Sequence, residues 1–387
     1  MTKKVRGPKL KMGKKKIAKA VEQVMDGGGH VLVSTPGMQD VAKGILKTLK
    51  KKHGISLAHQ RIEYTQFANG ELLPRIQETV RGKHVFFLIA LQHPDPNIAI
   101  MKMHLMNDAL KRASAASITL VTPYLPYLRQ DRKDKPRVPI SARLLADQIE
   151  SNKKVERVIT TDMHADQEQG FFAIPVDNLT SMKLFAEFIN HEFEKQLRSG
   201  EVVVVAADFG GAVRARRFSV LLGNAPVTIF EKRRTGANQA HVVSMIGESV
   251  KGKIAIIYED MIDTGGTIRE VSAELRAHGA NDVIVFATHG IFSSTNKIMH
   301  LINLASMLDQ PIKDKVIHAL KEMIDDGAEA QFAKANLKIY TTNSIPREAQ
   351  YLKENASWLT QIPMDELLAD AIHQAFVPGG SISKLLL

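Results

Sequence analysis

Two acids stand just before a glycine-rich turn in the stretch "IIYEDMIDTGGTI", which covers residues 256–268. The acids are Glu259 and Asp260, and the turn reads Asp-Thr-Gly-Gly-Thr over residues 263–267. Glycines let backbone N–H groups approach a ligand closely, and threonines offer hydroxyl groups. A helix expected over residues 267–278 would direct the positive end of its dipole at the turn. These features together predict a binding site for a phosphate group.

A carboxylate repels a phosphate, so the two acids need a second explanation. The neighbouring hydroxyl groups of a ribose can donate hydrogen bonds to acids, and a phosphorylated ribose would therefore satisfy both halves of the motif. The alternative is an ordinary tight turn between a strand and a helix, with a threonine cap. A Gly-Gly turn alone favours that alternative, whereas the two acids together with Asp263 favour a sugar phosphate.

The elements that must position this motif are short runs of apolar and β-branched residues. Several runs are apolar throughout, which is typical of strands covered on both faces. Amphipathic segments lie between them, as over residues 184–197, where the apolar spacing is helical. This alternation predicts an α/β fold with mostly parallel sheets. Strands are expected at residues 30–34, 84–90, 117–122, 155–161, 201–207, 227–230, 254–258, 283–288 and 337–342.

Ligand sites in open parallel sheets lie beyond the carboxyl ends of the strands. The strand expected at residues 254–258 would end near Tyr258, so both acids and the turn follow its carboxyl end. The predicted fold therefore places the motif where a ligand is expected.

Composition excludes several classes of protein. The chain has 387 residues, of which 44% are hydrophobic and 24% charged, enough for two folded domains. It has no cysteine, which excludes disulfides, thiolate zinc sites and a cysteine nucleophile. No apolar run is long enough to span a membrane, and the N-terminus lacks the apolar region of a signal peptide. We therefore expect a soluble, cytoplasmic protein.

The net charge of +11 is concentrated at the N-terminus. Residues 1–19 contain nine lysines and arginines and no acid, which leaves +2 for the other 368 residues. Such a basic arm could contact RNA or another polyanion. No aromatic residue is interleaved to stack on bases, so we favour a solvated arm over nucleic-acid contact.

Charged side chains also follow other predicted strands. Arg129 and Gln130 come after a proline-rich turn, where they could bind a nucleotide phosphate and a base edge, or belong to a solvated basic loop. His164 follows the strand at 155–161 between acids and could ligate a metal, although a lone histidine is more often structural.

Two further segments could either contact a ligand or be ordinary turns. Lys232 and Arg234 follow the strand at 227–230, where they could stabilise charge on a transferred group or form a solvated turn. The segment "FANGE" (67–71) reads as a polar hairpin turn at Asn69-Gly70, or as a ligand contact.

The stretch "EDMIDTGGT" resembles the phosphoribosyl-pyrophosphate motif that type I phosphoribosyltransferases share with ribose-phosphate pyrophosphokinases. Other segments resemble the second family alone, in the same order, and the resemblance covers most of the chain. These segments are "FANGE" (67–71), "YLRQDRKDKPRVPISARLLADQI" (127–149), "TDMHADQEQGFFAIPVDNL" (161–179), "ADFGGAVRAR" (207–216), "FEKRRTGANQ" (230–239) and "GGSISKLL" (379–386).

The resemblance implies that the anomeric hydroxyl of ribose 5-phosphate attacks the β-phosphorus of ATP, giving AMP and 5-phospho-ribose 1-diphosphate. It implies catalysis by Lys232, Arg234 and His164, and Mg²⁺ held by His164 and Asp208. Implied contacts of ATP are Phe67, Asn69, Gly70, Glu71, Arg129, Gln130 and His164. Implied contacts of ribose 5-phosphate are Arg234, Glu259, Asp260, Asp263, Thr264, Gly265, Gly266 and Thr267.

The resemblance also implies two phosphoribosyltransferase-like lobes. We expect a basic arm and first helix at 1–29, an ATP-side lobe at 30–172 rejoined by about 372–387, and a ribose-phosphate lobe at 173–371. A helical insertion is expected at about 295–336. The implied assembly is a homo-oligomer built from dimers, with a hexamer as one form, in which residues 67–71 reach adenine across a subunit interface.

The chain departs from the family pattern at several positions. Glu259 stands where an aspartate is usual, Asn69 replaces an acid, Lys102 replaces a glutamate, and Ala206-Ala207 replaces Ser-Pro. These changes concern the oligomer interface and regulation more than the chemistry.

Two other functions are compatible with parts of this pattern. A non-catalytic homologue that assembles with an active synthetase would be expected to lose catalytic residues, and a phosphoribosyltransferase would not need the ATP segment. The retained residues favour an enzyme; they are His164, Asp208, Lys232, Arg234 and the turn at 263–267.

Overall fold

The computed structural model describes residues 29–92, 95–233, 242–293, 328–377 and 379–385, with isolated positions between 310 and 316. The predicted basic arm and most of the predicted insertion at 295–336 therefore lie outside the described residues. Within the described residues, no helix has the length and apolar character needed to cross a membrane.

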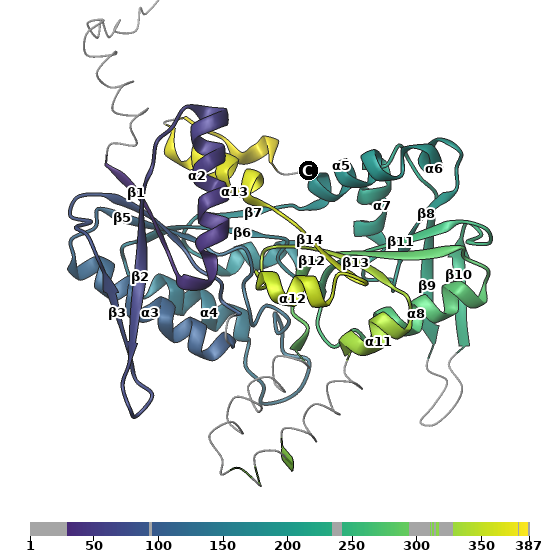
Figure 1. Cartoon of the computed structure of the whole chain (residues 1–387), viewed down its shortest axis with the longest axis horizontal. Helices are drawn as coiled ribbons and strands as arrows, with labels where there is room; N and C mark the ends of the chain where they lie inside the picture. The colour runs from purple at the N-terminus through teal and green to yellow at the C-terminus, as the bar shows by residue number, and fades with distance from the viewer. Residues whose placement is uncertain are drawn as a thin grey trace, which may run out of the picture.

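The strands form two seven-stranded sheets with the same order (Figure 1). The first sheet runs β3-β2-β1-β4-β5-β6-β7 and the second β10-β9-β8-β11-β12-β13-β14. In each sheet the edge pair, β2–β3 or β9–β10, is antiparallel and all other neighbours are parallel. The prediction of two lobes with mostly parallel sheets is confirmed, and both lobes share one topology.

The nine predicted strands all overlap observed strands, and five observed strands were missed. The first sheet contains β1 (His30–Ser34), β2 (Ala58–Gln66), β3 (Leu72–Ile76), β4 (His84–Leu88), β5 (Ser117–Val121), β6 (Val155–Thr161) and β7 (Val176–Leu179). The second contains β8 (Val202–Ala206), β9 (Val227–Arg233), β10 (Val242–Gly247), β11 (Ile254–Ile262), β12 (Asp282–Gly290), β13 (Lys338–Thr342) and β14 (Leu359–Ile362).

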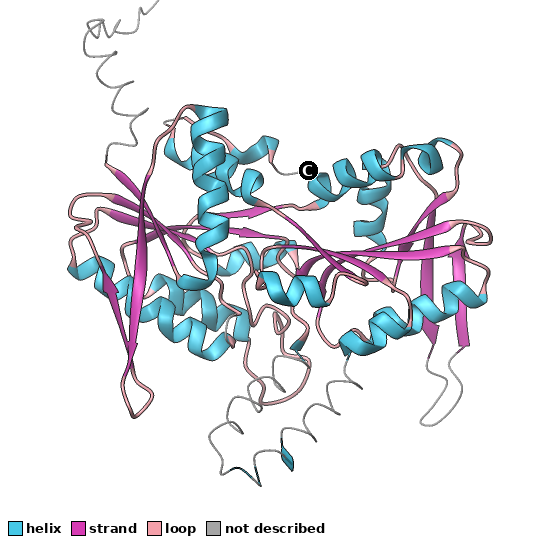
Figure 2. Ribbon diagram, viewed as in Figure 1, coloured by secondary structure: helices cyan, strands magenta, loops and turns pink. Residues whose placement is uncertain are grey.

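Helices cover both faces of each sheet (Figure 2). In the first lobe they are η1 (Pro36–Met38), α2 (Gln39–His53), α3 (Pro96–Arg112), α4 (Ser141–Glu150) and η2 (Asp166–Phe171). The helices α5 (Met182–Glu192), α6 (Glu194–Arg198), α7 (Ala212–Leu221), α8 (Gly266–Ala277), α11 (Ala328–Lys334) and α12 (Ala349–Glu354) follow, and α13 (Asp365–Phe376) and η3 (Ile382–Lys384) end the chain.

The chain crosses between the lobes twice. Helix α5 follows β7 of the first sheet, but its Phe185 and Ile189 are buried in the core of the second lobe. Helix α13 follows β14 of the second sheet, but its Leu368 and Ile372 pack into the core with α2. The first lobe therefore continues to the end of β7, beyond the expected boundary at residue 172. The chain rejoins it from the start of α13, earlier than the expected residue 372.

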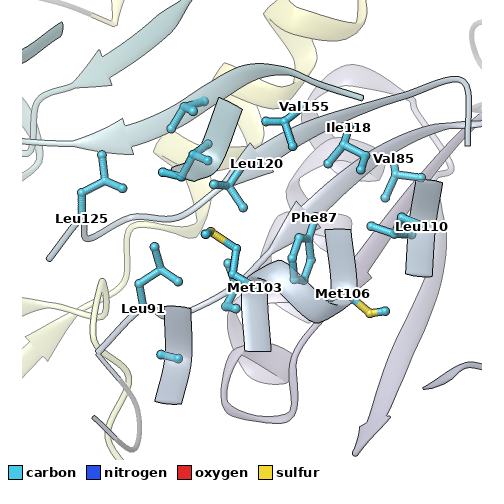
Figure 3. Close-up of a cluster of buried hydrophobic side chains, with 14 of the residues drawn as sticks. Val85, Phe87, Leu91, Met103, Met106, Leu110, Ile118, Leu120, Leu125 and Val155 are labelled. Carbon is cyan, nitrogen blue, oxygen red and sulfur yellow. The ribbon is translucent and has the colours of Figure 1, made fainter. Parts of the chain in front are cut away.

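A buried core between α3 and the first sheet holds the first lobe together (Figure 3). Met103, Met106 and Leu110 lie on one face of α3 at helical spacing and are fully buried. Phe87 of β4 and Leu120 of β5 belong to the same core. Each such side chain contributes about 1.5–3 kcal/mol when buried. This packing anchors α3 and positions the loop that leads into it.

Candidate functional site

The site lies where the strand order of the second sheet reverses, between β8 and β11. Consecutive connections leave that point in opposite directions, so a crevice opens at the carboxyl ends of the two strands. Strands β8 and β11 are parallel neighbours, with Val205 paired to Ile257. Asp208 comes two residues after β8, and Glu259 and Asp260 lie in the last part of β11.

Arg214 explains why two acids stand side by side. It lies on α7, and its Nη1 donates to Oε2 of Glu259 and to Oδ1 of Asp260, each at 3.0 Å. Its side chain is only 23% exposed, so these charge-assisted bonds are shielded from solvent. Sequence reasoning missed this residue. The available signal was an arginine in the first turn of a helix, where the dipole disfavours positive charge unless acids are near.

His164 connects the two lobes at the same acids. It follows β6 of the first sheet, and its Nδ1 lies 2.7 Å from Oδ2 of Asp260. The hydrogen bond to Asp260 raises the pKa of His164 above its ordinary value, although burial acts in the opposite direction. Burial alone would raise the pKa of Asp260, but His164 and Arg214 lower it to about 2. Asp260 is therefore ionised at neutral pH.

Two neighbouring glutamates titrate near neutral pH. Burial raises the pKa of Glu259 to about 7, while the charge of Arg214 acts in the opposite direction. Burial also raises the pKa of Glu168, whose Oε2 accepts from the backbone N–H of Ala165, to about 7. Such shifts cluster at functional sites, where they let a group exchange a proton in the physiological range.

The turn at 263–267 leaves the start of α8 open. Gly265 precedes the helix in the left-handed conformation (φ 71°), no side chain caps the helix, and its first turn has no acid. Thr264 and Thr267 are exposed, and a Cβ added to Gly266 would meet only open space. The first N–H groups of a helix lack intrahelical acceptors, so this end is ready for an anion.

Phe332 of α11 supports this turn from behind. A Cβ added to Gly265 would lie 2.0 Å from Cζ of Phe332, so only glycine fits between the turn and the ring. Phe332 is fully buried in the core of the second lobe, and Arg276 donates to the carbonyl of Asn336 just beyond α11 at 3.0 Å. Phe332 therefore packs against the turn at Gly265, whereas the side of the turn at Gly266 remains open.

Arg129 also reaches from the first lobe to the second. It lies in the loop after β5, and its Nη1 donates to Oδ2 of Asp263 at 3.0 Å. The adjacent Gln130 accepts from Oγ of Ser141 at 2.7 Å. The structure thus brings together residues that sequence reasoning assigned to two different substrates.

A buried polar network behind the site joins the lobes. Oδ2 of Asp162 accepts from the backbone N–H of Ser181 at 2.9 Å and from Oγ1 of Thr288 at 2.7 Å. Asp162 follows β6 of the first sheet, whereas Thr288 lies in β12 of the second. A satisfied buried network is rigid, so it holds the end of β6, which leads to His164, against β12.

A cleft of about 880 Å³ opens between η2 and α7, and neither Arg129 nor the turn at 263–267 is among its lining residues. His164, Arg214 and Asp260 line one part of it, and residues from both lobes line the rest. Its volume falls in the range of small-molecule sites, roughly 300–1,000 Å³.

Some predicted site residues lie elsewhere or cannot be described. Phe67 to Glu71 form the tip of the β2–β3 hairpin, which projects away from the junction of the lobes (Figure 1). The backbone N–H of Gly70 donates to the carbonyl of Phe67 at 2.8 Å, and Phe67 is 49% exposed. Lys232 lies in β9, but its side chain is outside the described set, as is all of Arg234.

Asp208 and His164 are the side chains implied as magnesium ligands. The described residues contain no ready-made group of three or more metal-ligating side chains. Asp208 is exposed and its Oδ1 accepts from the N–H of Gly211 at 2.9 Å, so Oδ2 remains for a cation. The Nδ1 of His164 faces Asp260, which leaves only Nε2. This set fits an ion whose remaining ligands are water and substrate oxygens, as Mg²⁺ prefers.

Family models match both lobes of the chain. Residues 30–152 match the N-terminal domain of ribose phosphate pyrophosphokinase, and residues 175–326 match the phosphoribosyl transferase domain.

Curated proteins and a solved structure are similar over most of the chain. A ribose-phosphate pyrophosphokinase of Fusobacterium nucleatum is 42% identical over 305 residues, covering 78% of this chain and 93% of that protein. A ribose-phosphate pyrophosphokinase of Thermotoga maritima is 44% identical over 256 residues, covering 66% and 79%. The phosphoribosylpyrophosphate synthetase of Mycobacterium smegmatis aligns with a TM-score of 0.68 and 32% identity, covering 90% of this chain and 99% of that one.

Proposed function

Because the chain belongs to the ribose-phosphate pyrophosphokinase family, we propose that it is a ribose-phosphate diphosphokinase. It transfers the β,γ-diphosphoryl group of ATP to the C1 hydroxyl of ribose 5-phosphate, giving 5-phospho-ribose 1-diphosphate and AMP. The observation that carries this proposal is the uncapped start of α8, which lies beside two acids held by Arg214.

The sugar phosphate would dock at the second lobe. Its 5-phosphate would accept hydrogen bonds from the N–H groups and hydroxyls of Asp263, Thr264, Gly265, Gly266 and Thr267, with Arg234 as a further contact. Its ribose hydroxyls would donate to Glu259 and Asp260. Arg214 stabilises the negative charge of both carboxylates, and a charged carboxylate accepts stronger hydrogen bonds than a neutral carboxyl group.

The nucleotide would dock from the first lobe. Arg129, Gln130 and His164 would contact its phosphates and base, and Phe67, Asn69, Gly70 and Glu71 of a neighbouring copy would contact the adenine. The outward projection of the β2–β3 hairpin supports an arrangement in which the tip serves another chain (Figure 1). The proposed assembly is accordingly a homo-oligomer built from dimers, whose size a sedimentation measurement would give.

The chemistry requires positioning and neutralisation of charge rather than a covalent enzyme intermediate. When bound, Mg²⁺ would neutralise charge on the polyphosphate, and Asp208 and His164 are the residues that would hold it. Lys232 and Arg234 would stabilise the negative charge that develops on the transferred group.

Two ion pairs between the lobes must give way to the substrates. Arg129 is paired with Asp263, and His164 is hydrogen-bonded to Asp260. Each pair joins a proposed nucleotide contact to a proposed sugar contact. They keep the side chains ordered before the substrates arrive, which reduces the entropy lost on binding.

The test is an assay of the purified full-length chain with ATP, Mg²⁺ and ribose 5-phosphate, following AMP release. We expect release that depends on the sugar phosphate. AMP formed equally well without the sugar would contradict the proposed transfer. No AMP under any condition would favour the non-catalytic homologue, and turnover of the diphosphate with a nucleobase in place of ATP would favour a phosphoribosyltransferase.

A further inference from the structure

The first lobe has a small cavity at the position equivalent to the site in the second lobe. Strands β1 and β4 correspond to β8 and β11, since both sheets have the same order, and they are parallel neighbours with Ser34 paired to Leu88. The strand order of the first sheet also reverses between them. A cavity of about 120 Å³ lies there, lined by Thr35, Pro36, Gly37, Tyr64, Ile89, Ala90, Ala99 and Lys102.

The start of the helix beside this cavity offers no uncapped end to a ligand. Helix α3 corresponds to α8, but Oδ1 of Asp95 accepts from the N–H of Asn97 at 2.8 Å and of Ile98 at 3.1 Å. The start of α3 is therefore capped by its own chain. A ligand in the cavity would be held by side chains instead.

Two of the lining side chains have unused polar capacity. The hydroxyl of Tyr64 is buried and has no hydrogen-bond partner in the described part of the chain. The Nζ of Lys102 lies 5.2 Å from the centre of the Tyr64 ring and forms no ion pair with any described residue. A buried hydroxyl without a partner is destabilising, so a ligand that accepts a hydrogen bond from it would stabilise the protein.

The surroundings of Lys102 favour an anion. Burial lowers the pKa of Lys102, and the nearby charge of Asp95 offsets this only in part. No carboxylate lines the cavity, and its other walls are mainly apolar. An anion beside Lys102 would restore the electrostatic stabilisation that burial removes.

We propose that this cavity, which Thr35 also lines, binds one small oxyanion of phosphate size, with Lys102 and Tyr64 as its donors. The volume is well below the roughly 300 Å³ at which sites for drug-sized ligands begin, so a nucleotide does not fit inside it. Each water takes about 30 Å³ of liquid volume, so a few waters would otherwise fill the space. The inference rests on the topology and the cavity, and it does not depend on the proposed reaction.

The test measures inorganic phosphate bound per chain by equilibrium dialysis of the full-length protein, with excess ribose 5-phosphate present to compete at the second lobe. We compare the unmodified chain with Lys102→Met and with Lys111→Met, which removes an exposed lysine on the same helix. We expect Lys102→Met to lose one equivalent of phosphate, or to bind it at least about tenfold more weakly. Lys111→Met should bind as the unmodified chain does.

Tyr64→Phe provides a second variant, because it removes only the unpartnered hydroxyl and keeps the ring that lies against Lys102. It should weaken the same equivalent by about threefold to tenfold. Sulfate should compete for the equivalent and chloride should not. Equal phosphate binding by Lys102→Met, Tyr64→Phe and the unmodified chain would overturn the proposal, as would the absence of this equivalent from the unmodified chain.

Discussion

Helices α3 and α8 occupy equivalent places in the two lobes, yet they begin differently. Asp95 caps α3 with hydrogen bonds to Asn97 and Ile98, so the N-terminal end of that helix is satisfied. Gly265 begins α8 without a side-chain cap. The strands before them differ in the same way, since apolar Ile89 and Ala90 follow β4 whereas β11 has Glu259 and Asp260 in its last part. One topology thus gives a large polar site in one lobe and a small, mostly apolar cavity in the other.

The ability of each lobe to bind a ligand depends on its loops and not on its sheet. Both sheets provide a crevice where their strand order reverses, because that follows from topology alone. What fills the crevice depends on a few loop residues and on the first turn of one helix. In the second lobe those residues leave the start of α8 without a side-chain cap and place two carboxylates nearby, whereas in the first lobe Asp95 caps the start of α3.

The largest expected effect follows from removing the proposed charge-stabilising group of the second lobe. Lys232→Ala should lower kcat by about 10³-fold, because a lysine that stabilises developing charge acts mainly in the transition state. Thermal unfolding should be nearly unchanged. The matched control is Lys47→Ala, an exposed lysine on α2 of the first lobe, which should leave kcat unchanged. A Lys232→Ala variant with near-normal turnover would remove this residue from the mechanism.

An aspartate at the start of α8, comparable to Asp95 at the start of α3, tests the difference between the two helices. Gly266→Asp puts a carboxylate at the start of α8, where the added side chain meets open space. It should raise KM for ribose 5-phosphate about 100-fold, because the carboxylate competes with the phosphate for the amides. Stability should change by less than about 1 kcal/mol. An unchanged KM for the sugar phosphate, measured by steady-state kinetics, would show that α8 does not bind it.

Removing the charge between the two acids should destabilise the second lobe. Arg214→Gln leaves Glu259 and Asp260 without their shared partner, at a cost of about 3 kcal/mol in the free energy of unfolding. Urea denaturation measures this. Arg217→Gln is the matched control, since Arg217 is 54% exposed and its pair with Asp166 spans 3.4 Å, so its removal should cost less than about 1 kcal/mol. Equal costs for the two variants would assign no special role to Arg214.

The pH dependence should reveal the raised pKa of Glu259. We expect kcat/KM for ribose 5-phosphate to fall as the pH drops through about 7, because protonated Glu259 no longer accepts from the ribose. The same raised pKa lowers the free energy of unfolding as the pH rises from the ordinary range of a glutamate through about 7. Glu168→Gln should keep the kinetic profile although its pKa is also near 7, and Glu259→Gln should abolish it. Loss of the pH dependence of kcat/KM in Glu168→Gln would show that Glu168, and not Glu259, is the group that titrates.

The smallest expected effect is in the first lobe. Asp95→Ala removes the cap of α3 and should cost about 1 kcal/mol in the free energy of unfolding. Turnover should remain unchanged, because the first lobe uses no amide of α3. A fall in kcat or a rise in KM for ribose 5-phosphate would break the comparison between α3 and α8.

Patterns of apolar residues were sufficient to predict the inner strands. Strand β8, for example, is buried along its whole length and reads Val-Val-Val-Val-Ala, a continuous apolar run. The five missed strands lie at or next to the sheet edges, where one face or side contacts solvent. In β2, for example, buried Gln60 and Ile62 alternate with exposed Arg61 and Glu63, a pattern that reads as polar. Local composition therefore hides edge strands.

The site was predicted only in part. The acids, the glycine turn, His164 and Arg129 were singled out, because each breaks a local pattern next to a strand end. Their partners were not, since Arg214 lies 45 residues from Glu259 and no local pattern links the two. The observed lobe boundaries differ from the predicted ones, because α5 packs on the second sheet and α13 packs on the first sheet.

The amino-acid sequence by itself determined the fold class, the positions of the inner strands along the chain and the chemical character of the loops, because these depend on periodicity and residue type within short segments. Only the tertiary structure decided which charges are neighbours: His164 with Asp260, Arg129 with Asp263, and Arg214 with both acids. Those distances depend on how two sheets dock across a buried network, and the burial that this docking creates raises the pKa of one acid while the neighbouring charges lower that of the other.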